Sequence, residues 1–171
     1  MTYPRKWIDS VTRRRAIMSS LACLGAGLTA APAIAAPGKA GTASLTALRE
    51  EADFSATPHR VYEALLDEKQ FTGFSGAPAK ISRTEGGTLS LFGGAIVARN
   101  VELVADKRIV QAWRDSDWAP GIYSIVKFEL TPRGAGTHLV MDQTGFPAGQ
   151  FSDLDPGWRE HYWEPMKKFL R

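Results

Sequence analysis

The sequence predicts one α+β domain in which an antiparallel β-sheet is covered by a long C-terminal helix. Three observations support this prediction. Residues 48–54 alternate between two faces, as in a strand with one buried face. Residues 79–144 continue as strand-like segments separated by glycine and other turn residues. Residues 158–169 carry large apolar side chains at helical spacing. The expected order is one strand, two helices, six strands and a long helix, with no internal repeat.

Two short helices are expected after the first strand. Thr57 followed by Pro58 is typical of a helix start, because the hydroxyl caps free N–H groups and proline suits the first helical position. Apolar residues then recur four apart, which gives this helix one apolar side. Asp67 is expected to cap a second short helix, which carries Phe71 and ends at Gly73.

Six further strands are expected between residues 79 and 144. Gly86-Gly87 and Gly93-Gly94 are dipeptides at which the backbone can reverse its direction. The residues between these and later turns alternate in polarity, as they do in strands. The expected strand segments are 80–83, 88–92, 95–104, 109–114, 123–130 and 138–144.

The last helix is expected to run from Asp155 to Leu170, because Asp155-Pro156 repeats the pattern of a capping residue followed by proline. Pro165 lies inside this helix and should kink it, since proline removes one backbone donor. A curved sheet that grips a helix often leaves a cavity between the two. The apolar residues at helical spacing are Trp158, Tyr162, Met166 and Phe169.

The net charge of +3 is concentrated near the N-terminus. The chain has 21 Lys and Arg residues against 18 Asp and Glu residues, and residues 1–35 hold five of the bases and one of the acids. The remainder is therefore close to neutral. Because nonspecific nucleic-acid binding needs a clustered positive surface, we expect no nucleic-acid partner.

Residues 1–35 have the pattern of an export signal. Three consecutive arginines at 13–15 precede an uncharged, mildly apolar stretch, as in the twin-arginine signature. Small residues at Ala33 and Ala35 suit the narrow pockets of a signal peptidase. We therefore expect a twin-arginine-type signal peptide that is cleaved near Ala35.

This pattern divides the chain into three parts. We expect the signal peptide at residues 1–35, a flexible linker at 36–44 and a periplasmic or secreted domain at 45–171. The alternatives are an uncleaved signal segment, which would be the domain's only tie to a membrane, and a lipid attached to Cys23.

Six segments carry a characteristic combination of residues. They are EGGTLSLFGG at 85–94, VELV at 101–104, KRIVQAWR at 107–114, WAPGIYS at 118–124, QTGFP at 143–147 and GWREHYWEPMK at 157–167. As a set they resemble the C-terminal domain of the activator of Hsp90 ATPase, over residues from about Leu45 to Leu170. The resemblance implies the START-like helix-grip fold (SRPBCC, Bet v 1-like), in which a curved antiparallel sheet of about seven strands wraps a long C-terminal helix. It also implies a space between sheet and helix that commonly holds an apolar ligand.

Residue types that support metal or nucleophilic catalysis are sparse. Beyond residue 35 the chain has no cysteine and three histidines, His59, His138 and His161. His161 and Glu164 lie three apart on the last helix, but two ligands do not make a metal site. We expect no metal, no cofactor and no catalytic residue.

Aromatic side chains gather in the C-terminal half and are the best candidates for the wall of a pocket. The alternative is that each of them simply fills the core. Trp118 stands out because it lies in a loop between strands, and strand alternation indicates that Arg114 also reaches the cavity. The expected ligand-binding residues are Trp113, Trp118, Tyr123, Phe128, Met141, Gln143, Trp158, Tyr162 and Met166.

Three functions remain open. The first is a non-catalytic carrier that holds a small hydrophobic or amphipathic ligand between the sheet and the C-terminal helix. The second is a protein-interaction module of the Hsp90-ATPase-activator type, related to chaperones, which predicts an exposed patch and a protein partner. The third is a cyclase/aromatase-like or hydrolase-like enzyme, which needs a positioned acid or base in the pocket. The candidates for that group are His161, Glu164 and Tyr123.

Overall fold

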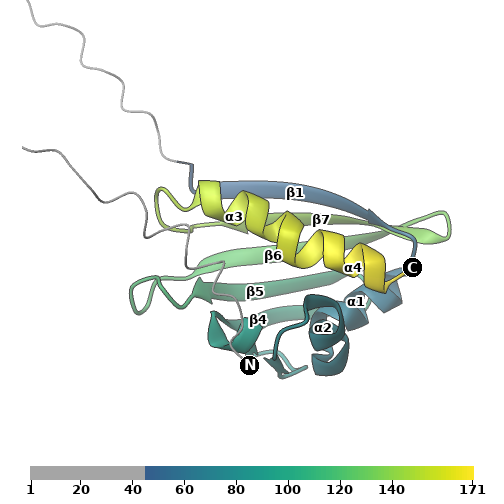
Figure 1. The fold of residues 1–171 in the computed structure, drawn as a ribbon, viewed down its shortest axis with the longest axis horizontal. Coiled ribbons are helices and arrows are strands. Elements are labelled where there is room, and N and C mark those ends of the chain that lie inside the picture. Colours follow the sequence, from purple (N-terminus) through teal and green to yellow (C-terminus); the bar gives the residue numbers. More distant parts are fainter. Residues whose placement is uncertain (1–44) are drawn as a thin grey trace, which may run out of the picture. The chain divides into compact units, whose positions relative to one another are not determined.

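A computed structural model describes residues 45–171, which form a seven-stranded antiparallel sheet accompanied by helices (Figure 1). The predicted order of one strand, two helices, six strands and a terminal helix is confirmed. The strands are β1 (Ala47–Phe54), β2 (Lys80–Ile81), β3 (Thr88–Leu91), β4 (Ile96–Val104), β5 (Arg108–Asp115), β6 (Ser124–Arg133) and β7 (Gly136–Thr144). The helical elements are α1 (Pro58–Leu66), α2 (Glu68–Ser75), the 3₁₀ turn η2 (Phe92–Gly94), α3 (Phe151–Trp158), the π-helical turn η3 (Arg159–Trp163) and α4 (Glu164–Phe169).

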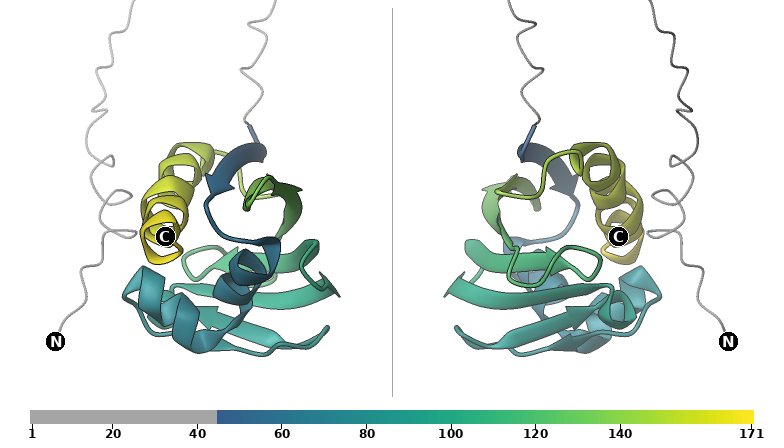
Figure 2. Two further views of the ribbon diagram at one scale, coloured as in Figure 1. Left: turned by 90° about the vertical axis from the view of Figure 1, so that its right-hand side faces the viewer. Right: turned by 90° about the vertical axis from the view of Figure 1, so that its left-hand side faces the viewer.

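The sheet is a meander with one added strand. Its spatial order is β1-β7-β6-β5-β4-β3-β2, so β2 to β6 each pair with the strand that follows in the chain, and β1 pairs with β7. One face of the sheet is buried, and we call it the inner face; the other is the outer face. Figure 2 shows that the sheet curves and that α3, η3 and α4 lie along its concave, inner side. This is the α+β architecture that the sequence predicts.

Strand alternation decides which side chains reach the inner face. In β1 every second residue is buried, beginning with Leu48 and ending with Phe54. The same alternation in β6 buries Ser124, Val126 and Phe128. Residues between these positions point to the outer face, because successive side chains of a strand lie on opposite sides.

Both predicted N-caps are confirmed in the two short helices. The Thr57 side chain accepts a hydrogen bond from a backbone N–H of the first turn of α1. Asp67 accepts from two backbone N–H groups at the start of α2. The predicted end of α2 at Gly73 is wrong, since the helix continues to Ser75 and stops at Gly76. Gly76 has a φ of 68°, a left-handed conformation that suits glycine and ends a helix.

The terminal helix begins earlier than predicted. It starts at Phe151 and not at Asp155, because the Gln150 carbonyl accepts hydrogen bonds from the backbone of Asp153 and Leu154 at 3.1 and 3.0 Å. Pro156 therefore lies within α3, where its missing N–H leaves one helix hydrogen bond unformed.

The interruption expected at Pro165 takes the form of a wide turn. Directly before this proline, the Glu164 N–H bonds to the Arg159 carbonyl, five residues back, so this hydrogen bond spans one residue more than the bonds of an α-helix. Proline cannot donate a backbone hydrogen bond, and the wide turn lets the helix continue past it.

Several predictions fall outside residues 45–171, namely the signal peptide at 1–35, its cleavage near Ala35, the linker at 36–44 and the lipid on Cys23. Across residues 45–171, no helix has the length and apolar character needed to cross a membrane.

Candidate functional site

The terminal helix presses a row of large side chains against the inner face of the sheet. Trp158, Tyr162, Trp163 and Met166 all point inward, and none is more than 2% exposed. They share one side of the helix because they lie about one or two turns apart. The sheet contributes Trp113 from β5, Phe128 from β6 and Met141 from β7, and all three are buried.

The aromatic rings in this space contact one another closely. Trp158 and Trp163 stack with ring centroids 5.5 Å apart and an interplanar angle of 16°. Trp158 also lies 5.7 Å from Phe128, 5.9 Å from Trp113 and 4.4 Å from Tyr162. Such ring pairs add stability beyond the area that they bury. The rings therefore fill much of the space in which the sequence predicts a ligand.

A chain of buried hydrogen bonds joins the terminal helix to the sheet. The Trp158 indole N–H donates to Gln143 Oε1 at 2.8 Å, and Gln143 Nε2 donates to Ser124 Oγ at 2.9 Å. The Ser124 hydroxyl then donates to the Trp113 carbonyl at 3.1 Å. Gln143 and Ser124 are fully buried. The amide that was expected to meet a ligand is thus bonded to the protein itself.

A second buried contact lies farther along the helix, and no sequence pattern predicts which residues make it. The Trp163 indole N–H donates to Glu50 Oε2 at 2.8 Å, and Arg159 Nε lies 3.1 Å from Glu50 Oε1. The Glu50 side chain is 7% exposed, and its burial raises the pKa of the carboxyl above the usual value, against the opposing effects of Trp163 and Arg159. The sequence signal for this contact is that Glu50 falls on the buried face of β1, between Leu48 and Ala52.

Tyr162 and Trp113 also carry buried polar groups. Burial raises the pKa of the Tyr162 hydroxyl far above its usual range, and the nearby Trp113 side chain opposes this only in part. The Trp113 indole N–H is buried and makes no hydrogen bond of good geometry within residues 45–171. Trp118 packs on Trp113, at 5.7 Å between ring centroids, whereas Tyr162 packs on Phe71 of α2, at 5.7 Å.

Trp118 closes this end of the inner space from its loop. It is 5% exposed, and its indole N–H donates to Gln150 Oε1 at 3.3 Å. A hollow of about 480 Å³ lies against it, with Ile122 and Pro147 in its lining. Arg114 was expected to reach the cavity, but its guanidinium donates to loop carbonyls instead, including that of Trp118 at 2.6 Å.

The structure places Tyr123 apart from the other predicted ligand-binding residues. It precedes β6, where alternation turns Ser124 inward, and the Tyr123 side chain is 48% exposed. The expected position of Tyr123 in the inner space is therefore corrected. The other eight predicted residues are buried on the inner side of the sheet or at its end. Their role in ligand binding stays a prediction.

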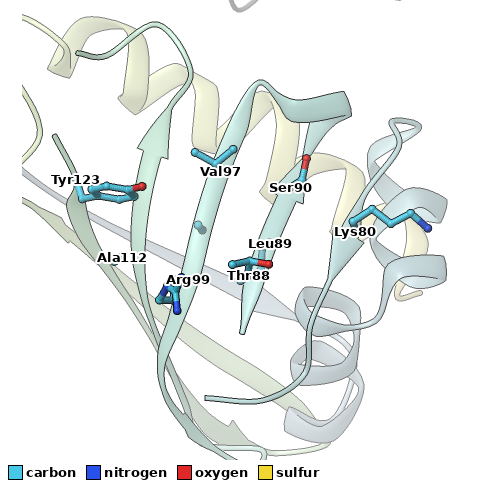
Figure 3. A pocket seen from close by; sticks show the side chains of 9 residues that line it. Lys80, Thr88, Leu89, Ser90, Val97, Arg99, Ala112 and Tyr123 are labelled. Carbon is cyan, nitrogen blue, oxygen red and sulfur yellow. The ribbon is translucent and has the colours of Figure 1, made fainter. Parts of the chain in front are cut away.

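Tyr123 instead lines a larger hollow of about 570 Å³ on the outer face, which we call the outer hollow (Figure 3). Its lining spans β2, β3, β4, β5 and the residue before β6. Leu89 and Ala98 point inward and contribute mainly their backbone. The lining residues are Lys80, Thr88, Leu89, Ser90, Val97, Ala98, Arg99, Ala112 and Tyr123.

The three side chains considered as catalytic acids or bases do not lie together in one site. His161 lies beside Phe92, with ring centroids 6.2 Å apart, and partial burial lowers the pKa of its imidazole. Glu164 is exposed and pairs with Lys167 at 3.3 Å, and Tyr123 is on the outer face.

The remaining histidines hydrogen-bond to carboxylates, His59 to Asp106 at 3.0 Å and His138 to Asp53 at 2.8 Å. In the part of the chain that the structure describes, no three His, Cys, Asp or Glu side chains are grouped so as to hold a metal ion.

Comparison with curated proteins finds related sequences of much greater length. The chain is 30% identical over 132 residues to the activator of 90 kDa heat shock protein ATPase homolog of Dictyostelium discoideum. It is 26% identical over 115 residues to the activator homolog 1 of Homo sapiens. These alignments cover 77% and 67% of this chain and 34% of each relative, so the chain spans about a third of the length of the curated relatives it matches.

Solved structures share the fold over most of their length. An HSP90 activator from Plasmodium falciparum aligns with a TM-score of 0.70 and 23% identity, covering 73% of this chain and 96% of that one. The Aha1 dimer from Colwellia psychrerythraea aligns with a TM-score of 0.63 and 14% identity, covering 74% and 96%. These likenesses confirm the predicted helix-grip fold. Residues 55–171, more than half of the chain, also match the family model described as "Activator of Hsp90 ATPase homolog 1-like protein". The chain therefore belongs to the family of Activator of Hsp90 ATPase homolog 1-like proteins.

Proposed function

We propose that this protein is a non-catalytic, protein-binding domain of the Hsp90-ATPase-activator type. The observation that carries the proposal is that two indole N–H groups of the terminal helix are bonded to side chains of the sheet. Trp158 binds Gln143, and Trp163 binds Glu50. A partner can then reach the surface of the domain more readily than the space under the terminal helix. Family membership supports the same conclusion, because several relatives are named as activators of a chaperone ATPase.

We also propose that the protein acts outside the cytoplasm. Support comes from the three arginines at 13–15 and from the small residues Ala33 and Ala35. The partner is then a protein of that compartment, and binding does not depend on ATP. Cell fractionation with N-terminal sequencing tests this part. The expected result is an extracytoplasmic protein that begins at Ala36, and Arg14→Lys with Arg15→Lys should retain it in the cytoplasm.

Photo-crosslinking in living cells tests the proposed protein binding. A photoreactive residue is placed at exposed positions of the outer face, such as Ile125, and of the terminal helix, such as Glu160. The proposal predicts a discrete crosslinked partner whose complex re-forms from the two purified proteins. Absence of a crosslinked protein at every scanned position would contradict it.

A small-ligand carrier is the second candidate, and two observations favour it. The hollow beside Trp118 is mainly apolar in its lining, and Trp113, whose ring packs on Trp118, has a buried N–H without a well-formed hydrogen bond. Burial of an aliphatic chain there would contribute about 0.8 kcal/mol for each methylene group.

Native mass spectrometry of protein purified from its own compartment separates the two candidates. The carrier predicts a bound small molecule that is lost in Trp118→Ala but retained in a surface control, Lys107→Ala. A mass equal to that of the chain alone would contradict the carrier and leave protein binding as the function.

A further inference from the structure

The outer hollow exists because a small residue lies in the middle of the outer face. Across neighbouring strands, Arg99, Ala112 and Ile125 stand directly opposite one another. The methyl group of Ala112 is much shorter than the side chains on either side of it. Figure 3 shows Val97 and Tyr123 near the same depression. The result is an apolar floor with aromatic and aliphatic walls on an otherwise solvated sheet.

The charged groups around this floor have one sign. Lys80 and Arg99 line the outer hollow, and its lining contains no aspartate or glutamate. The Arg99 guanidinium donates to the Gly86 carbonyl at 2.8 Å, which fixes its position without neutralising its charge. Lys80 makes an ion pair of 3.4 Å with Glu68, and its side chain is 86% exposed, so water screens this pair strongly. Both cations are thus available to an anionic partner.

The dimensions of the outer hollow fit an extended peptide segment. Its lining reaches from β2 to the start of β6, which is four steps between neighbouring strands or about 19 Å. An extended chain advances about 3.3 Å per residue, so about six residues would cross it. The hydroxyls of Thr88 and Ser90, both on β3, lie in the lining and can bond to a peptide backbone.

We propose that the outer hollow binds an extended acidic segment of a partner protein, with one apolar side chain seated over Ala112 and carboxylates beside Lys80 and Arg99. The inference rests on the proposed function and names the chemistry of the partner. Opposite charges across such an interface speed association and select the partner, while the apolar anchor supplies the central contact.

Fluorescence anisotropy with a defined probe tests the proposal. The probe is a labelled seven-residue peptide, Asp-Glu-Asp-Leu-Glu-Asp-Glu, and its counterpart carries lysine at every acidic position. The purified protein should bind the acidic peptide and not the basic one, and the affinity should fall as salt is raised, because exposed charges are screened. Equal binding of both peptides, or no binding of either, would overturn the proposal.

Three variants locate the binding site. Arg99→Glu and Lys80→Glu should each weaken binding of the acidic peptide by about tenfold. Ala112→Leu fills the floor without changing charge and should weaken binding by a similar factor. Lys107→Glu makes the same charge change at the exposed turn between β4 and β5 and should change the affinity less than about twofold.

Controls keep the result interpretable. The urea concentration at the unfolding midpoint shows whether each variant folds. The proposal requires weaker binding in Ala112→Leu and in at least one of Arg99→Glu and Lys80→Glu, each with an unchanged midpoint. Equal affinities for wild type, Arg99→Glu and Ala112→Leu would overturn it. Loss of the photo-crosslinked partner in the same variants would support it.

Two results distinguish this inference from the function on which it rests. A crosslinked partner that binds all variants equally would overturn the docking site while the proposed protein-binding function stands. Self-association of the protein that Ala112→Leu abolishes, seen by sedimentation velocity without any peptide binding, would assign the outer hollow to a second copy and overturn the acidic segment as its occupant.

Discussion

Replacing Gln143 by leucine should destabilise the protein although it puts an apolar residue into a buried site. Gln143 accepts the Trp158 indole N–H at 2.8 Å and donates to Ser124 at 2.9 Å. Leucine can do neither, so the indole N–H stays buried without a partner. Such an orphaned donor costs about 1 to 3 kcal/mol, and the lost bond to Ser124 about 1 kcal/mol more. The expected loss in the free energy of unfolding is about 2 to 4 kcal/mol.

Urea unfolding followed by tryptophan fluorescence measures this loss, and a double-mutant cycle isolates its cause. Trp158→Phe removes the donor, so Gln143→Leu in that background should cost less, by about 1 to 3 kcal/mol. For a domain of about 130 residues, the single variant should melt roughly 7 to 15 °C lower than wild type. Thr144→Val, next in the strand but exposed, should change stability by less than about 0.5 kcal/mol.

A loss of less than about 1 kcal/mol in Gln143→Leu, with no coupling to Trp158→Phe, would contradict this prediction. That result would mean that the indole N–H finds water or a bound molecule in the variant. The space under the helix would then be open, and the carrier function would gain support over protein binding.

Three further predictions concern other parts of the fold. Burial raises the pKa of Glu50 above 4.5, so wild type should gain stability relative to Glu50→Gln as the pH falls through the raised pKa and lose that advantage as the pH rises. The same difference in urea midpoint between the two proteins at mildly acidic and at neutral pH would contradict this. Gly136→Ala should cost more than about 2 kcal/mol in urea unfolding, because its Cβ would lie 2.2 Å from the Phe54 carbonyl oxygen, and a near-neutral result would show that β1 and β7 can separate there. Asp67→Ala should cost about 1 kcal/mol through loss of the α2 cap while Asp67→Asn stays near wild type, and equal losses measured by thermal melting would refute the capping role.

Local patterns in the sequence predict most of the fold. Alternation identifies the buried face of β1, and Thr57 and Asp67 mark helix starts through hydrogen bonds made within a few residues. The capping pattern at Asp155 misplaces the start of the terminal helix, because the Gln150 carbonyl accepts the helix's first hydrogen bonds. Element ends depend on such individual contacts more than on periodicity.

The candidate site was less predictable, because it depends on contacts between distant segments. Periodicity correctly buries Trp158 and Gln143, but it cannot show that they bond to each other. Glu50 joins Trp163 across more than a hundred residues. Tyr123 could be assigned to the outer face only once the register of β6 was known. The outer hollow likewise arises from cross-strand neighbours of Ala112, which only the sheet register brings together.

The central claim is that the protein binds a partner through its outer face while the space under the terminal helix stays closed. NMR titration of the isotope-labelled protein with the acidic peptide tests it most directly. The account predicts backbone shifts that concentrate around Arg99 and Ala112, with unchanged indole N–H signals for Trp158 and Trp163. Indole signals that shift or broaden while the outer face stays unaffected would contradict it.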